Sequence, residues 1–227
     1  MDLADFEQRI GYRFKDKNLL STALTHSSYA NERKASQVPD NERLEFLGDA
    51  VLETVVSDYL FRHFPDMPEG ELTRFRAGVV CEPVLVKVAN ELCAGDFLLL
   101  GKGEETTGGR ERKSILADAF EAVAGAIYLD GGMRRAKSFI LKNLTPEIKR
   151  MRESFLTIDN KTRLQEIIQR TSRQPVVYVI VGETGPDHDK TFTAEASHSG
   201  ETLGRGVGRS KKEAEQNAAH ESLGRYA

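Results

Sequence analysis

The stretch Asp40–Val56, DNERLEFLGDAVLETVV, decides the fold of the first half of the chain. Its apolar residues recur at helical spacing, and Leu44, Leu47 and Val51 lie on one side of such a helix. On a helix that advances about 100° per residue, three acids of this stretch fall within about 60° of one another. These acids are Glu42, Glu45 and Asp49. The stretch therefore predicts an amphipathic helix with an acidic stripe beside its core face.

The acidic stripe has two possible meanings, a solvated helix face or a metal site. A solvated face usually carries Lys or Arg four residues from its acids, but here Asp49 follows Glu45 and Glu53 follows Asp49. Like charges at that spacing are mildly destabilising. Because a bound cation would remove this repulsion, the missing bases favour a metal site, and the solvated face remains the alternative.

A second acidic pair lies in the stretch LADAFEAVAG, residues 116–125. Asp118 and Glu121 share one side of a helix, while the core side carries Ile115, Ala119, Val123 and Ala126. Gly125 lies close behind the two acids, and its missing side chain leaves space there. The two stretches therefore predict two helices, each with acids beside its core face.

The ligand types indicate which ion such a site would bind. The candidate ligands are carboxylates without Cys or His at ligand spacing nearby, so hard Mg²⁺ or Mn²⁺ is favoured over zinc. These ions support phosphodiester hydrolysis. A di-iron carboxylate bundle would need Glu-x-x-His motifs, and neither EFLGD nor DAFEA contains one. His26 in LTHSS is a possible base, although a lone His beside an apolar helix face is more often structural.

Composition sets broad limits on the class of protein. The chain has 227 residues, and its 32 Lys and Arg against 35 Asp and Glu give a net charge of -3, which neither favours nor excludes a nucleic-acid partner. Cys81 and Cys93 lack metal-ligand spacing and indicate reduced thiols in a cytosolic protein. No apolar run approaches the roughly 18 residues of a membrane span, and the acidic N-terminus is unlike a signal peptide. We therefore expect a cytoplasmic protein without a membrane partner.

The chain divides into two parts with different patterns. Residues 1–152 show helical spacing interrupted at Gly and Pro, which predicts an all-helical domain. Beyond the two acidic helices, we expect helices in KNLLSTALTHSS, EGELTRFRAGVV, PVLVKVANELC and RRAKSFILKNLTPEIKRM. The segment 101–113, GKGEETTGGRERK, is the one long irregular segment expected in this half.

The second part is smaller and mixed. The short polar stretch 153–160 is expected to link it to the helical domain. In residues 161–227, KTRLQEIIQR and SKKEAEQNAAHESLGRY have helical patterns, whereas PVVYVIVGE, KTFTAEASH and a short GETLGRGVG alternate as strands do. The expected order is α-β-β-β-α, which is a small α+β domain.

Four motifs resemble a known family. NERLEFLGDAVL and LADAFEAVAGAIYLD resemble the two signature helices of the ribonuclease III family, and GPDHDKTF with SKKEAEQNAA resembles the double-stranded RNA-binding domain that follows them. The resemblance covers nearly the whole chain and implies an all-α endonuclease domain at 1–152 and an α+β RNA-binding domain at 161–227. It also implies a magnesium-dependent homodimer without a small-molecule cofactor. Such an enzyme cuts both strands of duplex RNA, leaves 5′-phosphate and 3′-hydroxyl ends with short 3′ overhangs, and processes rRNA precursors and other structured transcripts.

The resemblance also implies roles for individual acids. The metal-binding quartet that it implies consists of Glu45, Asp49, Asp118 and Glu121. Within this quartet, Asp49 and Glu121 are expected to be the most sensitive catalytic residues. Glu42 and Glu69 match further acidic positions that support catalysis near the dimer cleft, and 101–113 matches a loop that faces the RNA. The presence of all six acids argues against a relative that binds RNA without cutting it.

In the RNA-binding domain, two lysines stand at the start of the last helix. Lys211 and Lys212 can meet phosphates, helped by the positive end of the helix dipole, although two lysines at a helix start are also ordinary surface. The resemblance supports the phosphate role and implies minor-groove contacts by Gln165, Glu166 and His188. Related domains often carry a third base where this chain has Glu215, so the domain alone is expected to bind phosphates modestly.

The first acidic helix also predicts a dimer surface. Phe46 lies on the flank nearer the acids, where an apolar ring would otherwise be exposed. Since a duplex has two strands and one helical half supplies one carboxylate cluster, we expect a twofold-symmetric homodimer with one cluster for each strand. Two other classes remain open: an RNA-binding regulator that lost the chemistry, and a metal-dependent phosphohydrolase of small molecules, which would leave the C-terminal domain unexplained.

Overall fold

The computed structural model describes residues 2–158, 160–186 and 190–226. Contacts divide the chain into two compact units, Met1–Lys149 and Arg150–Ala227. The first unit is helical and the second combines helices with a three-stranded sheet, so the expected fold class is confirmed. Among the described residues, no helix is long and apolar enough to cross a membrane.

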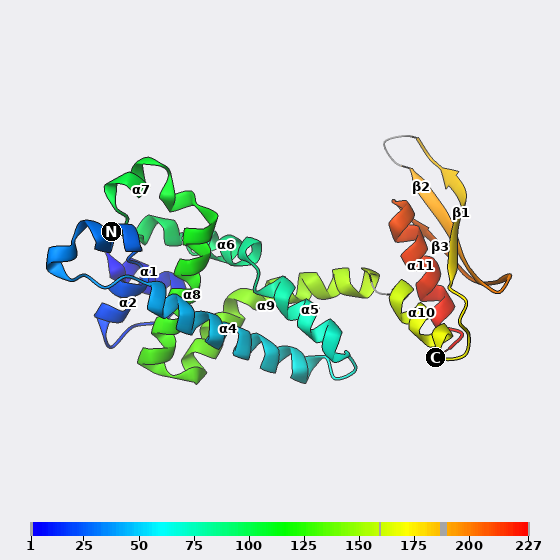
Figure 1. The fold of residues 1–227 in the computed structure, drawn as a ribbon, viewed down its shortest axis with the longest axis horizontal. Coiled ribbons are helices and arrows are strands. Elements are labelled where there is room, and N and C mark those ends of the chain that lie inside the picture. The colour runs from blue at the N-terminus through cyan, green and yellow to red at the C-terminus, as the bar shows by residue number, and fades with distance from the viewer. Residues whose placement is uncertain (1, 159, 187–189, 227) are drawn as a thin grey trace. The chain divides into compact units, whose positions relative to one another are not determined.

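The helical unit contains both acidic helices at its centre. Its helices, together with α9 that continues beyond it, are α1 (Leu3–Ile10), α2 (Lys17–Ala23), α3 (Ser27–Glu32), η1 (Lys34–Ser36), α4 (Glu42–His63), α5 (Glu69–Val79), α6 (Glu82–Glu91), η2 (Ala94–Phe97), α7 (Lys102–Thr106), η3 (Gly109–Glu111), α8 (Lys113–Gly131) and α9 (Met133–Ile158). Helix α8 packs against α2, α4 and α6, and eleven of its residues are buried (Figure 1). Its central position explains why its apolar pattern extends around most of the helix.

The expected helix in KNLLSTALTHSS is wrong in one respect, because it is two helices. The chain leaves helical geometry between α2 and α3, where Leu99 N donates to Leu24 O at 2.8 Å and His26 N donates to Leu99 O at 3.0 Å. An isolated bridge pairs Thr25 with Leu99. These long-range backbone bonds compete with the helical ones, and no local pattern announces them.

The segment 101–113 is not irregular, contrary to the expectation. It contains the short helix α7 and the turn η3, and Arg110 holds it in place. The Arg110 side chain pairs with Glu105 through two bonds of 2.6 and 2.7 Å and donates to the carbonyls of Gly95 and Leu98 at 2.8 Å. The expected helices also lacked α1, although Asp2 caps its start and Gly11, at φ 71°, ends it.

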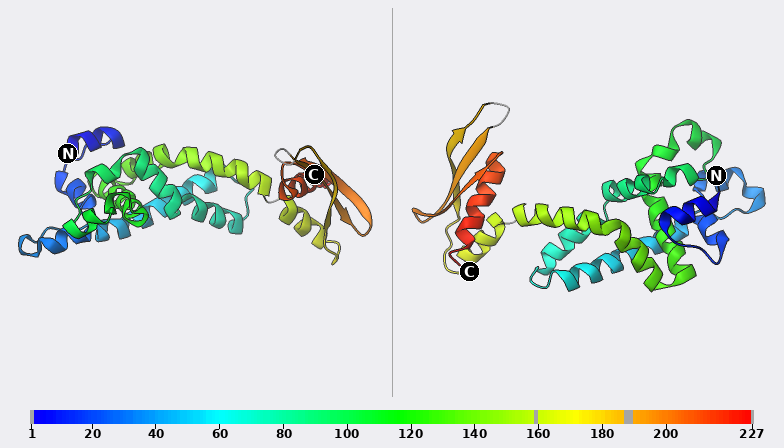
Figure 2. Two further views of the ribbon diagram at one scale, coloured as in Figure 1. Left: turned by 90° about the horizontal axis from the view of Figure 1, so that it is seen from above. Right: turned by 180° about the vertical axis from the view of Figure 1, so that it is seen from behind.

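The second unit has the expected α-β-β-β-α order. Its elements are α10 (Asn160–Gln169), β1 (Val177–Thr184), β2 (Thr191–His198), β3 (Glu201–Gly208) and α11 (Lys211–Leu223). The sheet is antiparallel in the order β1-β2-β3, and α10 and α11 lie on one of its faces (Figure 2). The third strand, expected to be short, is as long as the other two.

Glycines let α11 pack directly on the backbone of β3. A Cβ on Gly206 would lie 2.0 Å from Ala218 N, and one on Gly208 would lie 2.6 Å from Ala214 N. Ala214 and Ala218 are fully buried with Leu164 of α10 in the core of this unit. Small residues on both sides therefore bring the helix close to the sheet and fix the position of its first turn.

Candidate metal centre and RNA-binding surface

The acids of α4 and α8 meet because two glycines let the helices touch. A Cβ on Gly48 would lie 1.8 Å from the carbonyl oxygen of Glu121, and one on Gly125 would lie 2.4 Å from that of Leu44. Any side chain at either position would push the helices apart. The space expected at Gly125 is thus filled by the backbone of α4, which carries Glu45 to the acids of α8.

Three carboxylates form the centre of this contact. Oxygens of Glu45, Asp118 and Glu121 all lie within 4.8 Å of one another. All three side chains are partly buried, while Asp49 and Glu42 on α4 are exposed. The structure therefore groups three of the four expected metal ligands, and Asp49 lies beside the group rather than within it.

Burial, and after it the charges of neighbouring acids, raises the pKa values of carboxylates in this group. Burial, followed by the charges of Asp49, Asp118, Glu45 and Glu53, raises the pKa of Glu121 to about 8. Burial also raises the pKa of Glu45, with further increases from Asp118, Glu42 and Asp49. Partial burial with like charges nearby is unfavourable, so a cation bound among these oxygens would offset a large repulsion.

Two residues outside the expected set also act on the cluster. Burial raises the pKa of Asp118, the charge of His26 lowers it, and that of Glu82 raises it. Nδ1 of His26 accepts from Ser28 N at 3.2 Å and so caps α3, which agrees with a structural role. Glu82 stands in the first turn of α6, far from the acidic stretches in sequence, and no spacing pattern connects it with them.

Glu69 lies elsewhere in the single chain. It is exposed in the first turn of α5, where its Oε1 accepts from Thr73 Oγ1 at 2.9 Å. It lines a hollow with Phe61, Leu72 and Arg76 rather than joining the three carboxylates. Its expected support of the site is untested and stays a prediction.

In the second unit, the expected RNA contacts have different surroundings. Lys211 and Lys212 are exposed in the first turn of α11, which Ser210 caps by accepting from Glu213 N at 3.2 Å. Glu166 is exposed on α10, whereas Gln165 Oε1 accepts from Val176 N at 2.8 Å, which anchors that helix to the start of β1. His188 lies outside the described residues.

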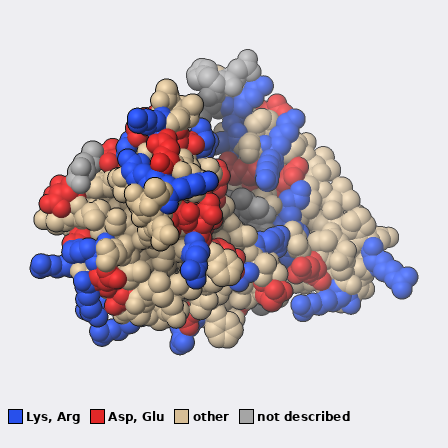
Figure 3. Space-filling model, turned by 60° about the vertical axis from the view of Figure 1, so that its left-hand side comes forward, with Lys and Arg blue, Asp and Glu red and all other residues tan. Residues whose placement is uncertain are grey.

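Glu215, the acid at the position where related domains often carry a third base, is paired with a lysine. Glu215 Oε2 accepts from Lys161 Nζ at 2.7 Å, and this ammonium also lies 4.3 Å from the Tyr178 ring centroid. The pair ties α11 to α10 and neutralises Glu215. On the face shown in Figure 3, basic and acidic side chains are interspersed, so that face is not uniformly basic.

Comparison with known proteins agrees with both units. Residues 16–148 match the model of ribonuclease-III-like proteins, and residues 160–224 match the double-stranded RNA binding motif. The chain therefore belongs to the ribonuclease III family. A ribonuclease 3 from Pelotomaculum thermopropionicum is 54% identical over 96% of this chain and 90% of its own length. One from Geobacillus kaustophilus is 52% identical over 96% and 89%.

A solved structure resembles the helical unit alone. The nuclease domain of ribonuclease III from Campylobacter jejuni is 47% identical, covers 63% of this chain and 99% of its own, and superposes with a TM-score of 0.58. That Campylobacter nuclease domain has a structurally flexible region involved in dimer formation. The resemblance stated from the four sequence motifs is thereby confirmed.

Proposed function

We propose that this chain is a metal-dependent endoribonuclease that hydrolyses double-stranded RNA. Membership of the ribonuclease III family supports the type of reaction. The three grouped carboxylates of α4 and α8 support the position of the active site. The products are duplexes with 5′-phosphate and 3′-hydroxyl ends and short 3′ overhangs. Structured transcripts, including rRNA precursors, are the substrates that the family processes.

Mg²⁺, with Mn²⁺ as a substitute, is the proposed ion. The donor set supports a hard cation, because Glu45, Asp118 and Glu121 offer only carboxylate oxygens. Asp49 would complete the set, since its charge already acts on two of the three groups. When bound, such an ion polarises a phosphoryl oxygen and lowers the pKa of bound water.

The residues of the chain have three tasks in this proposal. The partly buried carboxylates of α4 and α8 would hold the ion. Glu42 adds negative charge next to Glu45, and Glu69 would support the site near the dimer cleft, as the matching family position does. The exposed bases Lys102 and Lys113 in and after α7 would contact the substrate backbone, as the family loop does.

The second unit would hold the duplex by its shape. A-form RNA presents 2′-hydroxyls in a shallow minor groove and phosphates at its edges. Glu166 and Gln165 on α10, with His188, would face the minor groove, while Lys211 and Lys212 would meet phosphates at the positive end of α11. Because Lys161 neutralises Glu215, that acid would not repel the backbone strongly.

A homodimer is proposed from the surface of α4. Phe46 is 80% exposed and Phe61 is 74% exposed on this helix, whereas large apolar side chains are ordinarily covered. A second copy would cover them and bring a second carboxylate cluster to the other RNA strand. The relation of the Campylobacter nuclease domain to dimer formation supports this arrangement.

Domain limits and location complete the proposal. We place the catalytic and dimerisation domain at 1–152, the linker at 153–160 and the RNA-binding domain at 161–227. The two family matches, 16–148 and 160–224, support this order of domains. Helical backbone to Ile158 makes the connection part of α9 rather than an extended strand. The free Cys81 and Cys93 fit a cytoplasmic location.

One assay tests the main proposal. The full chain is incubated with a long RNA duplex and with a single strand of the same sequence, each with and without Mg²⁺. Cleavage of the duplex alone, and only with the ion, is expected. Duplex binding without cleavage at any Mg²⁺ or Mn²⁺ concentration would indicate the RNA-binding regulator instead.

A further inference from the structure

A basic hollow lies apart from the carboxylate cluster. It has a volume of about 390 Å³, lies between residues 11–15 and the junction of α8 with α9, and is lined by Arg13, Lys15, Arg134 and Arg135. Hollows of a few hundred Å³ are the size of small-ligand sites. The lining residue Gly131 is ten residues after Glu121 on α8, which is about 15 Å along the helix axis.

The cations around this hollow are mostly uncompensated. Within the described part of the chain, Arg13, Arg134 and Arg135 make no hydrogen bond or ion pair through their side chains. Lys15 Nζ donates at 3.3 Å to the backbone oxygen of Asp130, and its charge is among the influences that lower the pKa of the Asp130 carboxyl, so Lys15 is partly compensated. Four like charges around one hollow repel one another, so an anion placed among them would be stabilised.

The nearest acid is already occupied. Asp130 Oδ2 accepts from Tyr12 Oη at 2.6 Å and from Lys15 N at 3.0 Å, and its Oδ1 accepts from Asp16 N at 2.9 Å. The carboxylate therefore holds residues 12–16 in place rather than pairing with the arginines. One negative charge against four positive ones leaves the hollow cationic.

The backbone adds to this positive potential. Helix α9 begins at Met133, so Arg134 and Arg135 stand in the first turn of a 26-residue helix. The first N–H groups of a helix lack intrahelical acceptors, and the helix dipole places partial positive charge there. Lys142 lies close as well, since a Cβ on Gly11 would be 3.1 Å from its Nζ.

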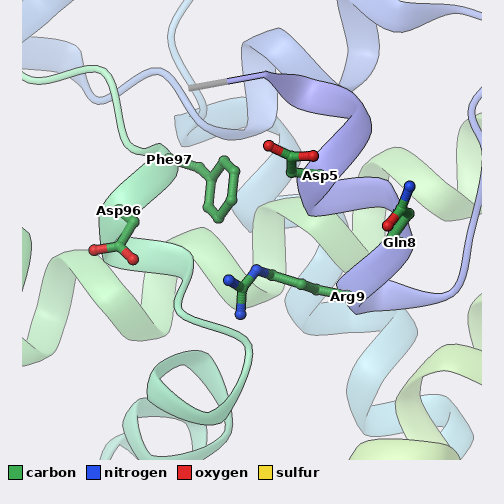
Figure 4. A pocket seen from close by; sticks show the side chains of 5 residues that line it. All are labelled: Asp5, Gln8, Arg9, Asp96 and Phe97. Carbon is green, nitrogen blue, oxygen red and sulfur yellow. The ribbon is translucent and has the colours of Figure 1, made fainter.

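A second hollow of the helical unit shows the contrast. It is lined by Asp5, Gln8, Arg9, Asp96 and Phe97, and Figure 4 shows Arg9 of α1 extending toward the η2 segment. Its single guanidinium is engaged, because Arg9 Nη1 donates to Cys93 Sγ at 3.2 Å. This second hollow has two carboxylates and one guanidinium, and the guanidinium already has a partner. It therefore lacks the positive charge that an anion requires.

We propose that the basic hollow binds a small phosphorylated molecule, with two linked phosphates in the manner of a nucleoside diphosphate. Planar guanidinium groups bind phosphate oxygens through paired, charge-assisted hydrogen bonds, and the three free arginines provide such donors from two segments. The concave shape and small volume fit a compact ligand better than the outer edge of an RNA duplex. This inference does not depend on the proposed function, because it uses none of its residues.

The test uses inorganic pyrophosphate as the probe and the full chain without divalent metal. Calorimetric titration at fixed ionic strength compares wild type with Arg134→Gln and with Lys149→Gln. Both variants remove one exposed positive charge from α9. Among the described residues the Lys149 side chain makes no hydrogen bond or ion pair, and it lies far from the hollow along that helix. We expect Arg134→Gln to weaken binding about tenfold, Arg13→Gln with Arg134→Gln to weaken it further, and Lys149→Gln to leave it within about twofold.

Three results would overturn the inference. The first is no binding of pyrophosphate to wild type at millimolar concentration. The second is equal weakening by Arg134→Gln and Lys149→Gln, which would show a general effect of charge. The third is unchanged pyrophosphate binding with weaker duplex RNA binding by Arg134→Gln, which would assign these arginines to the RNA backbone. Unchanged melting temperatures of the variants would exclude misfolding as the cause of any loss.

Discussion

The two units hold their important side chains in opposite environments. In the helical unit, Glu45, Asp118 and Glu121 are partly buried between touching helices, and burial raises the pKa of each. In the α+β unit, Lys211 and Lys212 stand exposed in the first turn of α11. Partial burial places the carboxylates where a bound cation would be stabilised. Exposure keeps the lysines hydrated, which suits reversible binding of a long polyanion such as RNA.

Glycines allow close backbone approach in both units, but with different consequences. Gly48 and Gly125 bring two helices together and thereby bring carboxylates into contact. Gly206 and Gly208 bring α11 onto the sheet, while Lys211 and Lys212 at its start stay exposed. The same local device therefore creates a desolvated site in one unit and supports an exposed surface in the other.

The largest expected effect tests the buried site. Glu121→Gln keeps the side-chain shape and removes one anionic ligand, so cleavage of duplex RNA should fall by about three orders of magnitude or more. Duplex binding should stay within about twofold, because the recognition lysines are untouched. Glu82→Gln is the matched control, since Glu82 acts on Asp118 only by its charge. Near-normal turnover by Glu121→Gln at saturating Mg²⁺ would remove this residue from the proposed site.

The second prediction tests the helix contact itself. Gly48→Ala places a Cβ 1.8 Å from a carbonyl oxygen, so the helices must separate and the protein should lose about 1–3 kcal/mol or more of unfolding free energy. Thermal or urea unfolding measures the loss, and stabilisation by Mg²⁺ should shrink with it. Gly70→Ala on α5 is the control, because nothing lies within 4 Å of its Cβ position. Equal stability of the two variants would contradict the close contact.

The third prediction concerns the exposed surface. The double change Lys211→Gln and Lys212→Gln should weaken duplex binding about tenfold and reduce the salt dependence of binding by roughly two ion equivalents. Binding isotherms at several salt concentrations measure both quantities. Cleavage of RNA at saturating concentration should persist, because the carboxylates are intact. A loss of turnover at saturation with unchanged affinity would reverse the roles assigned to the two units.

The buried site also predicts a pH dependence of the stability of the helical unit. The pKa of Glu121 is raised from 4.5 to about 8, so the folded protein binds this proton more tightly than the unfolded chain does. The protonated Glu121 carboxyl therefore contributes to the unfolding free energy of the metal-free protein. This contribution is complete below pH 4.5 and is lost as the pH rises toward 8. The slope from one such group is at most about 1.4 kcal/mol per pH unit.

The pH prediction has an internal control. Glu121→Gln lacks the titrating group, so its unfolding free energy should fall less steeply over the same range. Mg²⁺ binding must displace the proton, and the affinity of wild type for Mg²⁺ should therefore rise with pH up to about 8. Parallel stability curves for wild type and Glu121→Gln would show that the shift does not arise from this carboxyl.

Much of the fold follows from local patterns. Helical spacing predicted α4, α8 and α9, and alternation predicted the three strands of the second unit. The expected single helix over KNLLSTALTHSS failed because Leu99 pairs with the backbone near Thr25. The regular structure within 101–113 was not predicted. It depends on hydrogen bonds from Arg110 to the carbonyls of residues 95 and 98, and no pattern inside the segment indicates these bonds.

The sequence by itself determined which acids share a helix face, because that depends only on the helical repeat. It also determined that Gly125 leaves room behind Asp118 and Glu121. Only the tertiary structure decided that Gly48 meets the backbone at Glu121, that three carboxylates lie within 4.8 Å, and that Asp49 stays at the solvent edge. The physical reason is that distances between helices and the degree of burial sum contributions from the whole core, whereas spacing along one helix is local.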